Sequence, residues 1–278
     1  MVRTETDEYT GSFFTKQPFW DITRKRTDTF LQIENENVRI LRYGMNEGAD
    51  GLKCIPGVGQ VGITFSVQEK EAQAYLYRVL PEKKILSQYG IKESTQVQFS
   101  PGSFSKVTGI SASDIPAEGL PLKDVFPWAT PFIEEVNSVD SVEEHHGAIL
   151  KFLQECVRKK NNIRETDKEL ARCVVNYLMK HRQITRMKEL EQEYGFCART
   201  IQKAVVSNVG ITPKQLNLQI CLQNAIQTIA EDPALSLTEL TYRMQFYDQS
   251  HFGSVFRRMT GFCPGQYQKW QQEEKGGK

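Results

Sequence analysis

The 278-residue sequence lacks close cysteine pairs and long apolar runs. Its six cysteines are scattered, with no Cys-x-x-Cys spacing, which excludes the common zinc motifs and favours a reduced, cytosolic protein. No stretch of about 18 apolar residues occurs, which argues against a membrane-spanning helix. The first residues, MVRTETDEYTGSFF, are acidic and polar where a secretory signal is basic and then apolar. We therefore expect a cytoplasmic protein without a membrane partner.

The sequence is also poor in metal-ligand clusters. The adjacent pair His145 and His146 has no cysteine nearby and no further histidine one helical turn away. We expect this pair to be solvated at a helix start, and we expect neither a metal nor a cofactor.

A strong net charge is missing too, but the formal +1 hides an uneven distribution. Residues 1–150 carry 15 Lys+Arg and 21 Asp+Glu, a net charge of −6, whereas residues 151–278 carry 20 and 13, a net charge of +7. At roughly 100–200 residues per domain, the length predicts two domains. The positive half is the one suited to a polyanion.

The amino-terminal half has the pattern of short strands. Runs rich in Val, Ile, Tyr and Phe are separated by Gly and Pro clusters, at 38–44, 57–67, 74–80 and 97–104. Because no regular helix separates them, they favour an antiparallel sheet, sandwich or barrel. We therefore predict a two-domain α+β protein in which residues 1–140 form a β-rich domain with short helices.

Aromatic residues are frequent before Gly90, among them Phe13, Phe14, Phe19, Trp20, Phe30, Tyr43, Phe65, Tyr75, Tyr77 and Tyr89. They could line an effector pocket in which Arg39, Arg42 or Arg78 binds an anionic ligand. The simpler interpretation, core aromatics and solvated arginines, is the one we favour, and the sequence names no ligand-binding residue.

Residues 141–167 read as a helix followed by a linker. Ser141 stands three residues before Glu144, the spacing of a capping box. The apolar residues of this helix recur at helical spacing, so one face packs either on the first domain or on a second subunit in a homodimer. The polar run at 159–167 is the natural linker.

The remaining residues, 168–278, contain an internal repeat. Its copies are 184–216 and 235–267, and each has an apolar helix, a turn at Phe196 or Phe246, a second helix and a Gly-x-x-Pro sequence. The offset between the copies grows from 50 at the phenylalanines to 51 at the prolines, which places one inserted residue near the start of the second copy's second helix.

A helix, a short turn and a second helix form the helix-turn-helix motif, whose second helix enters the major groove of DNA. The alternative, an ordinary helical hairpin, is weakened by the duplication within a basic region. The segment between the copies predicts a rigid spacer helix. Two recognition helices held about 34 Å apart would enter successive major grooves, so that a monomer reads both.

The second copy, QFYDQSHF at 245–252 followed by FRRMTGFCP at 256–264, closely resembles the signature of the AraC/XylS family of bacterial transcription regulators. YGFCARTIQK at 194–203 and GITPK at 210–214 resemble that family's first motif. This resemblance implies a β-rich sensing or dimerisation domain and a seven-helix DNA-binding domain. It also implies an activator that binds promoter DNA and contacts RNA polymerase. Its activity would be controlled by a small-molecule or protein effector.

The resemblance further implies which residues face DNA. In the first motif, whose recognition helix spans about 198–206, they are Ala198, Arg199, Thr200, Gln202 and Lys203. In the second motif, whose helix begins near Asp248, they are Gln249, Ser250, His251, Ser254, Arg257 and Arg258. For His251 a structural role is an equal alternative. Ile201, Val205, Phe252 and Phe256 fall on the opposite faces and are expected in the core.

The sequence departs from the family pattern at several positions. Ser254 stands where the family commonly has Arg, and Gln245 where it commonly has a turn Gly. Cys197 and Cys263 replace helix-capping Ser or Thr and are interpreted as small buried residues, with a thiol switch as the alternative. Gln219 and Ile220 lie where the family often has Arg. We expect the first motif to carry most of the base specificity.

An enzyme is the rival class, because DNA-repair methyltransferases carry similar motifs. Such an enzyme needs a reactive cysteine, and Cys54 has one adjacent lysine and no clustered partner. We therefore expect no catalytic residue and no enzymatic activity.

Overall fold

The computed structural model describes residues 3–4, 23–45, 52–55, 60–68, 71–79, 84–87, 93–160 and 165–276. Predictions for Phe13, Phe14, Phe19, Trp20 and Tyr89, and for the middle of the linker at 161–164, lie outside these ranges. No helix among the described residues is long and apolar enough to cross a membrane.

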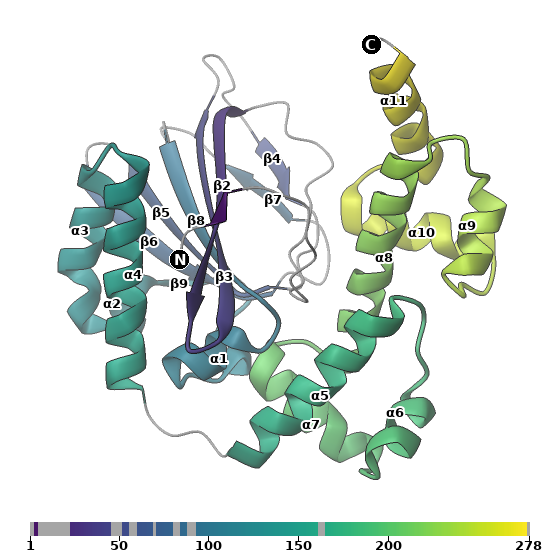
Figure 1. Ribbon diagram of the computed structural model, residues 1–278, viewed down its shortest axis with the longest axis horizontal. Coiled ribbons are helices and arrows are strands. Elements are labelled where there is room, and N and C mark those ends of the chain that lie inside the picture. Colours follow the sequence, from purple (N-terminus) through teal and green to yellow (C-terminus); the bar gives the residue numbers. More distant parts are fainter. Residues whose placement is uncertain are drawn as a thin grey trace.

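The amino-terminal half is built on an antiparallel seven-stranded sheet, which confirms the predicted fold class (Figure 1). Its strand order is β1-β2-β3-β8-β5-β6-β9, and a second sheet pairs β4 with β7. The strands are β1 Arg3–Thr4, β2 Thr23–Ile33, β3 Glu36–Met45, β4 Leu52–Ile55, β5 Gly62–Gln68, β6 Glu71–Tyr77, β7 Lys84–Ser87, β8 Glu93–Phe99 and β9 Leu120–Pro121. The sequence predicted β3, β5, β6 and β8, whereas β1, β2, β4, β7 and β9 were not predicted.

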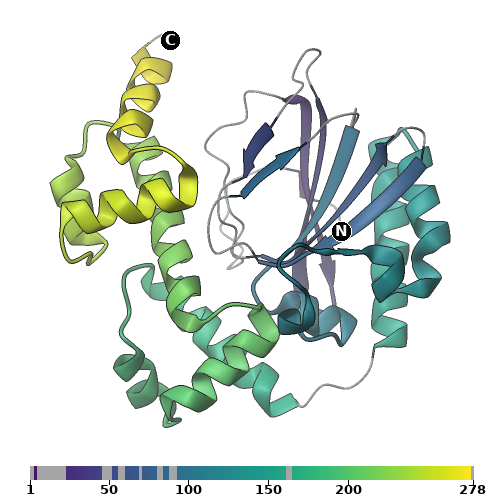
Figure 2. The same cartoon turned by 180° about the vertical axis from the view of Figure 1, so that it is seen from behind.

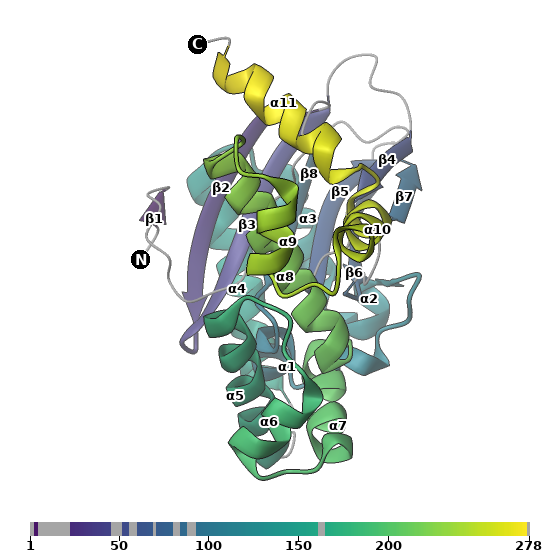
Figure 3. The ribbon, with the colours of Figure 1, turned by 90° about the vertical axis from the view of Figure 1, so that its right-hand side faces the viewer.

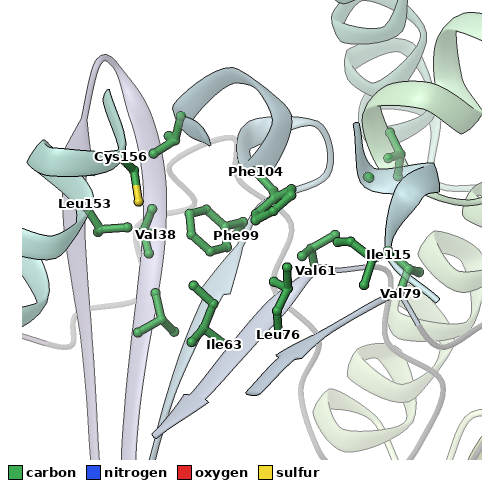
Figure 4. Close-up of a cluster of buried hydrophobic side chains, with 14 of the residues drawn as sticks. Val38, Val61, Ile63, Leu76, Val79, Phe99, Phe104, Ile115, Leu153 and Cys156 are labelled. Atoms are coloured by element: carbon green, nitrogen blue, oxygen red, sulfur yellow. The ribbon is translucent and has the colours of Figure 1, made fainter. Parts of the chain in front are cut away.

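One face of the large sheet is apolar and covered by helices. In register, Val38 pairs with Phe99, Ile40 with Val97, and Ile63 with Val97 on the other side. Since residues in register point the same way, these side chains form a continuous apolar surface. Helices α3 (Thr130–Ser138) and α4 (Val142–Lys159) lie along this face, as Figures 1 and 2 show. Figure 4 shows Phe99 and Phe104 meeting within the same core, ring edge to ring face, with centroids 5.4 Å apart.

The helix predicted from Ser141 is present and capped as expected. The Ser141 hydroxyl accepts from the Glu144 backbone N–H at 3.2 Å and donates to the Glu144 carboxylate at 2.7 Å. The apolar face of α4 packs on the sheet of its own chain, where Phe152 lies 6.1 Å from Phe65, centroid to centroid. Of the two surfaces that the sequence left open for this face, the structure selects the first domain.

The prediction of a solvated histidine pair is wrong. His145 and His146 are buried, at 5% and 7% exposure, between α4 and the sheet. His145 Nε2 lies 2.7 Å from the hydroxyl of Thr95, and His146 Nε2 lies 2.6 Å from that of Thr29. Burial lowers the pKa of both rings, that of His145 to about 4. The pair is part of the packing between helix and sheet.

Short helices connect the sheet to α4. They are α1 Ser103–Thr108, the 3₁₀ turn η1 Ala112–Asp114, α2 Leu122–Val125 and the 3₁₀ turn η2 Pro127–Ala129. Both α1 and η1 also touch the carboxy-terminal half (Figure 1).

The described carboxy-terminal half consists of seven helices, the number that the family resemblance implies (Figures 1 and 3). They are α5 Glu165–His181, α6 Met187–Tyr194, α7 Ala198–Val209, α8 Pro213–Glu231, α9 Leu237–Arg243, α10 Gln249–Thr260 and α11 Pro264–Gly276. The apolar core divides within α8. Residues up to Ile220 belong to one cluster that continues into the β domain, whereas Cys221 begins a separate cluster around the second motif.

Candidate nucleic-acid interface

The first repeat folds as a helix, a three-residue turn and a second helix. Helix α6 ends at Gly195, whose φ of 69° is left-handed and suits glycine. Helix α7 begins at Ala198, whose backbone N–H donates to the Glu191 carboxylate at 2.7 Å. Ile201 and Val205 are fully buried, as predicted, and fix the orientation of α7.

The opposite face of α7 is exposed and polar. Arg199, Gln202 and Lys203 are exposed, at positions three and four residues apart that share one side of a helix. Ala198 and Thr200 beside them are half-buried. Within the part of the chain that the structure describes, Arg199 and Lys203 form no ion pair. This face thus offers two uncompensated cations and an amide, the groups that bind phosphates and purine edges.

The second repeat has the same frame with a longer turn. Helix α9 is followed by residues 244–248, and α10 begins after Asp248, whose carboxylate accepts from the His251 backbone N–H at 2.7 Å. Phe252 and Phe256 are fully buried, as predicted. The residue inserted into this copy is Tyr247, which is 93% exposed in the turn.

The outer face of α10 carries all six residues predicted for the second motif, and all of them are exposed: Gln249, Ser250, His251, Ser254, Arg257 and Arg258. Gln249 and His251 have contacts inside the chain. The Gln249 carbonyl oxygen accepts from the Thr238 hydroxyl at 3.1 Å, and the His251 ring packs against Phe246 at 5.5 Å between centroids. His251 therefore has a structural contact as well as an exposed edge.

The departure at Gln245 has a visible consequence. Gln245 has a φ of 58°, the left-handed conformation that Gly195 adopts in the first motif at 69°. A residue with a Cβ pays about 1–2 kcal/mol in this region relative to its preferred conformations. The second motif therefore keeps the fold of the turn with a strained residue.

The prediction that Cys197 and Cys263 are buried is wrong. Cys197 is exposed and Cys263 half-buried. Cys197 occupies the cap position of α7 but makes no capping hydrogen bond to the helix. Its Sγ lies 3.3 Å from the hydroxyl of Thr200, which lowers the pKa of the thiol.

The spacer is α8, a 19-residue helix begun by a capping box between Thr212 and Gln215. At 1.5 Å per residue it is about 28 Å long. Gln219 and Ile220, the positions where the family often has Arg, are buried within it, at 1% and 2% exposure. The separation of about 34 Å between the recognition helices stays a prediction.

The carboxyl end of α7 is held by the β domain, a contact that the sequence did not indicate. The Arg78 guanidinium donates to the carbonyl oxygen of Gly210 at 2.7 Å. The Ser111 hydroxyl donates to the carbonyl of Ser207 at 2.8 Å, and the Ser105 hydroxyl to that of Asn208 at 3.2 Å. These bonds satisfy carbonyls left open at a helix end, where a cation is also favoured.

The other two arginines considered from the sequence are also engaged. Arg39 is 4% exposed and forms a bidentate pair with Asp28, so the interpretation as a solvated arginine is wrong for it. Arg42 donates to Glu93 at 2.9 Å and to the carbonyl of Asp140 at 2.6 Å. Neither arginine is an unpaired cation awaiting an anion.

No group of three or more His, Cys, Asp or Glu residues in the described ranges could hold a metal ion. Cys54 lies in β4, and its side chain falls outside the description. Burial raises the pKa of the Cys156 thiol, and raises that of Cys221 to about 12.

The chain has sequence matches among known proteins. Residues 190–269 match the model of a helix-turn-helix domain family. The chain is 27% identical over 73 residues to the HTH-type transcriptional activator RhaS of Escherichia coli O139:H28, and this match spans about a quarter of each protein, 26%.

Among solved structures, the chain is similar to ToxT from Vibrio cholerae at 14% identity and a TM-score of 0.46, covering 84% of this chain and 98% of that one. A structure of ToxT bound to (E)-4-(8-methylnaphthalen-1-yl)but-3-enoic acid matches at 14% identity and a TM-score of 0.45, covering 84% and 99%. The family match identifies residues 190–269, in the carboxy-terminal half, as a helix-turn-helix domain. Both sequence matches agree with the resemblance of the repeated motifs to the AraC/XylS family.

Proposed function

We propose that this protein is a sequence-specific DNA-binding transcription regulator that acts as an activator at a promoter. The observation that carries the proposal is the repeated frame, in which α7 and α10 each bury one face and expose a polar one. Arg and Lys bind guanine edges and Gln binds adenine edges, and the first motif presents Arg199, Gln202 and Lys203 together. The second motif adds Arg257 and Arg258 for phosphates.

The test is binding to DNA recovered by selection from a pool of random duplexes. In fluorescence anisotropy, Arg199→Ala and Gln202→Ala each weaken binding to the selected duplex by about 1–3 kcal/mol, or roughly 5- to 150-fold. Arg158→Ala is the matched control, because it removes an exposed arginine from α4, far along the chain from both motifs. Parental affinity in both recognition-helix variants would contradict the assignment of α7 as a reader.

We also propose that the β domain controls the DNA-binding domain through its contact with α7. The supporting observation is that one apolar cluster runs from the sheet into the first motif, whereas the second motif has its own. A ligand or protein bound to the β domain would change the position or rigidity of the first recognition helix before that of the second. The three hydrogen bonds from Arg78, Ser105 and Ser111 are the contacts at stake.

The partners follow from this role. Double-stranded promoter DNA, RNA polymerase and one effector are expected, and the protein is expected to work in the bacterial cytoplasm without catalysing a reaction. Homodimerisation stays a prediction. Because the apolar face of α4 is covered by its own sheet, a dimer would use another surface.

A further inference from the structure

The face of the seven-stranded sheet turned away from α4 is polar. The strand register places its side chains in three rows across β3, β8, β5 and β6. The rows are Arg39, Gln98, Gly62 and Tyr77; then Leu41, Gln96, Thr64 and Tyr75; then Tyr43, Ser94, Ser66 and Gln73. We call Arg39, Tyr43, Tyr75, Tyr77, Gln96 and Gln98 the polar sheet face.

The middle of this face is lined by small residues. Strand β5 contributes Gly62, Thr64 and Ser66, whereas its neighbours carry tyrosines, glutamines and an arginine. With strands about 4.8 Å apart, β5 contributes less side-chain volume to this face than the strands on either side of it. Figure 1 shows β4 and β7 on this side, opposite the helices that cover the apolar face.

Hydrogen bonds link three of the large polar side chains around this strand, Tyr43, Gln96 and Gln98. The Gln96 amide donates to the Tyr43 hydroxyl at 3.1 Å, and the Gln98 amide donates to the Gln96 carbonyl at 3.4 Å. Gln98 is 8% exposed, and within the described ranges its own carbonyl oxygen, Oε1, has no hydrogen-bond partner. A buried acceptor without a donor is costly, so such an atom points to a missing group. Its neighbour across the row is Gly62, which has no side chain to supply one.

Charge on this face is compensated. Arg39 is paired with Asp28, which lies on the same side of the sheet. Burial raises the pKa of Tyr43 and of Tyr77, and the nearby hydroxyls of Tyr75 and Tyr43 add to the shift at Tyr77. The phenols are therefore neutral at physiological pH, and they lie close to one another. A charged ligand would be buried here without a counter-ion, which is unfavourable.

The ring pair on β6 adds a surface for a flat group. The Tyr75 and Tyr77 rings lie 6.2 Å apart, centroid to centroid, with an angle of 31° between their planes. Tyr75 is 36% exposed, so the pair is not filled by the protein's own packing. Aromatic side chains of this kind bind planar ligands by offset stacking.

We propose that the polar sheet face binds an uncharged aromatic molecule that donates a hydrogen bond to Gln98 Oε1. This proposal rests on the proposed function, since it names the chemistry of the effector that the β domain senses. The compensated charge selects an uncharged ligand, and the tyrosine rings select an aromatic one. The buried acceptor without a donor selects a ligand that donates a hydrogen bond.

The test compares three probes with one ring and different charge, by thermal unfolding of the full chain without DNA. Benzamide is neutral and donates a hydrogen bond, benzoate is an anion and benzylammonium is a cation. A ligand that binds only the folded state raises the unfolding midpoint with concentration. At tenfold its Kd, benzamide raises the midpoint by about 2–4 °C, whereas the two ions leave it unchanged. No shift with benzamide, or an equal shift with benzoate, overturns the proposal.

Two substitutions locate the site. Gln98→Met keeps the length of the side chain and removes the acceptor, so the benzamide shift is lost, whereas the same change at the exposed Gln32 leaves it intact. Gln98→Glu introduces a carboxylate, so benzylammonium now raises the midpoint. This gain keeps the test decisive if Gln98→Met does not fold. An unchanged benzamide shift in Gln98→Met, or no benzylammonium shift in Gln98→Glu, overturns the assignment.

Failure here is separable from failure of the proposed function. DNA binding by the parent and its loss in Arg199→Ala are measured without any probe. A chain that binds DNA but not benzamide contradicts the ligand class alone.

Discussion

The Arg78 guanidinium donates two hydrogen bonds to the carbonyl oxygen of Gly210, at 2.7 and 3.2 Å, across 132 positions of sequence. Gly210 ends the first recognition helix, with a φ of 91°, and an added Cβ there would lie 3.2 Å from the carbonyl oxygen of Ala112 in the β domain. The β domain and the first recognition helix, α7, are therefore joined at the helix end opposite the exposed Arg199.

Removing this link should loosen the first motif but not the second. Arg78→Ala leaves a half-buried carbonyl without its donor, and we expect a loss of about 1–2 kcal/mol in the free energy of unfolding. Hydrogen exchange should quicken in α7 and α1 while α10, which packs in a separate core, keeps its rates. Arg158→Ala serves as the control. Equal acceleration in α7 and α10 would show that the two motifs open together.

The strained turn of the second motif gives a stabilising substitution. Gln245→Gly relieves the left-handed φ of 58°, and we expect a gain of about 0.5–1 kcal/mol by urea denaturation, after the extra entropy of glycine in the unfolded chain. Gly195→Ala, at a φ of 69° in the first motif, is the inverse change and should destabilise. A destabilised Gln245→Gly would mean that the glutamine side chain makes a stabilising contact.

Capping of the first recognition helix is similarly open to improvement. Cys197→Ser places a hydroxyl where the thiol makes no capping bond, and should add about 0.5–1 kcal/mol to the free energy of unfolding. Chemical denaturation of the reduced parent and of the reduced Cys197→Ser variant measures the free energy of unfolding of each. The exposed Ser254 is unchanged in both proteins. No change on substitution would indicate that the Glu191 contact to Ala198 already satisfies the helix start.

The buried histidines predict acid sensitivity. The pKa of His145 is lowered from 6.5 to about 4 by burial, so between these values the unfolded state binds more protons than the folded state. Stability is therefore complete above about pH 6.5 and falls as the pH drops towards 4, by roughly 2–3 kcal/mol for His145. Urea midpoints across this range should slope less in His145→Gln than in the parent. His181→Gln, a change at an exposed histidine, is the matched control.

The serine at position 254 predicts a gain of DNA affinity. Ser254→Arg adds a cation to the exposed face of α10, and each neutralised phosphate changes the slope of log K against log salt by about −0.9. We expect a steeper slope and tighter binding at low salt in anisotropy titrations. Ser113→Arg, an exposed serine of the β domain, controls for net charge. Identical slopes in the two variants would place residue 254 away from DNA.

The repeat was predictable because its information is local. Gly210 and Pro213, and their counterparts Gly261 and Pro264, mark helix ends by conformations that few other residues adopt, so their spacing is visible in the sequence. Ile201 and Phe252 follow from helical periodicity in the same way.

The features that were missed depend on distant partners. Strand β2 begins TRKRTDT, which has no apolar alternation, and it is a strand because β3 pairs with it. His145 and His146 are polar by type and buried only because Thr95 and Thr29 meet them from the sheet. From the sequence alone Arg78 is interpreted as a surface residue, because its partner Gly210 is distant in the chain. Propensity is overridden by tertiary contact in each case.

The central claim is that one chain places two recognition helices in successive major grooves. Hydroxyl-radical footprinting of the selected duplex tests it most directly, with the parent and with Arg199→Ala. We expect two protected segments on one face of the duplex, about 10–10.5 base pairs apart, and loss of protection chiefly in one segment in the variant. A single protected segment, or two segments on opposite faces of the duplex, would contradict the account.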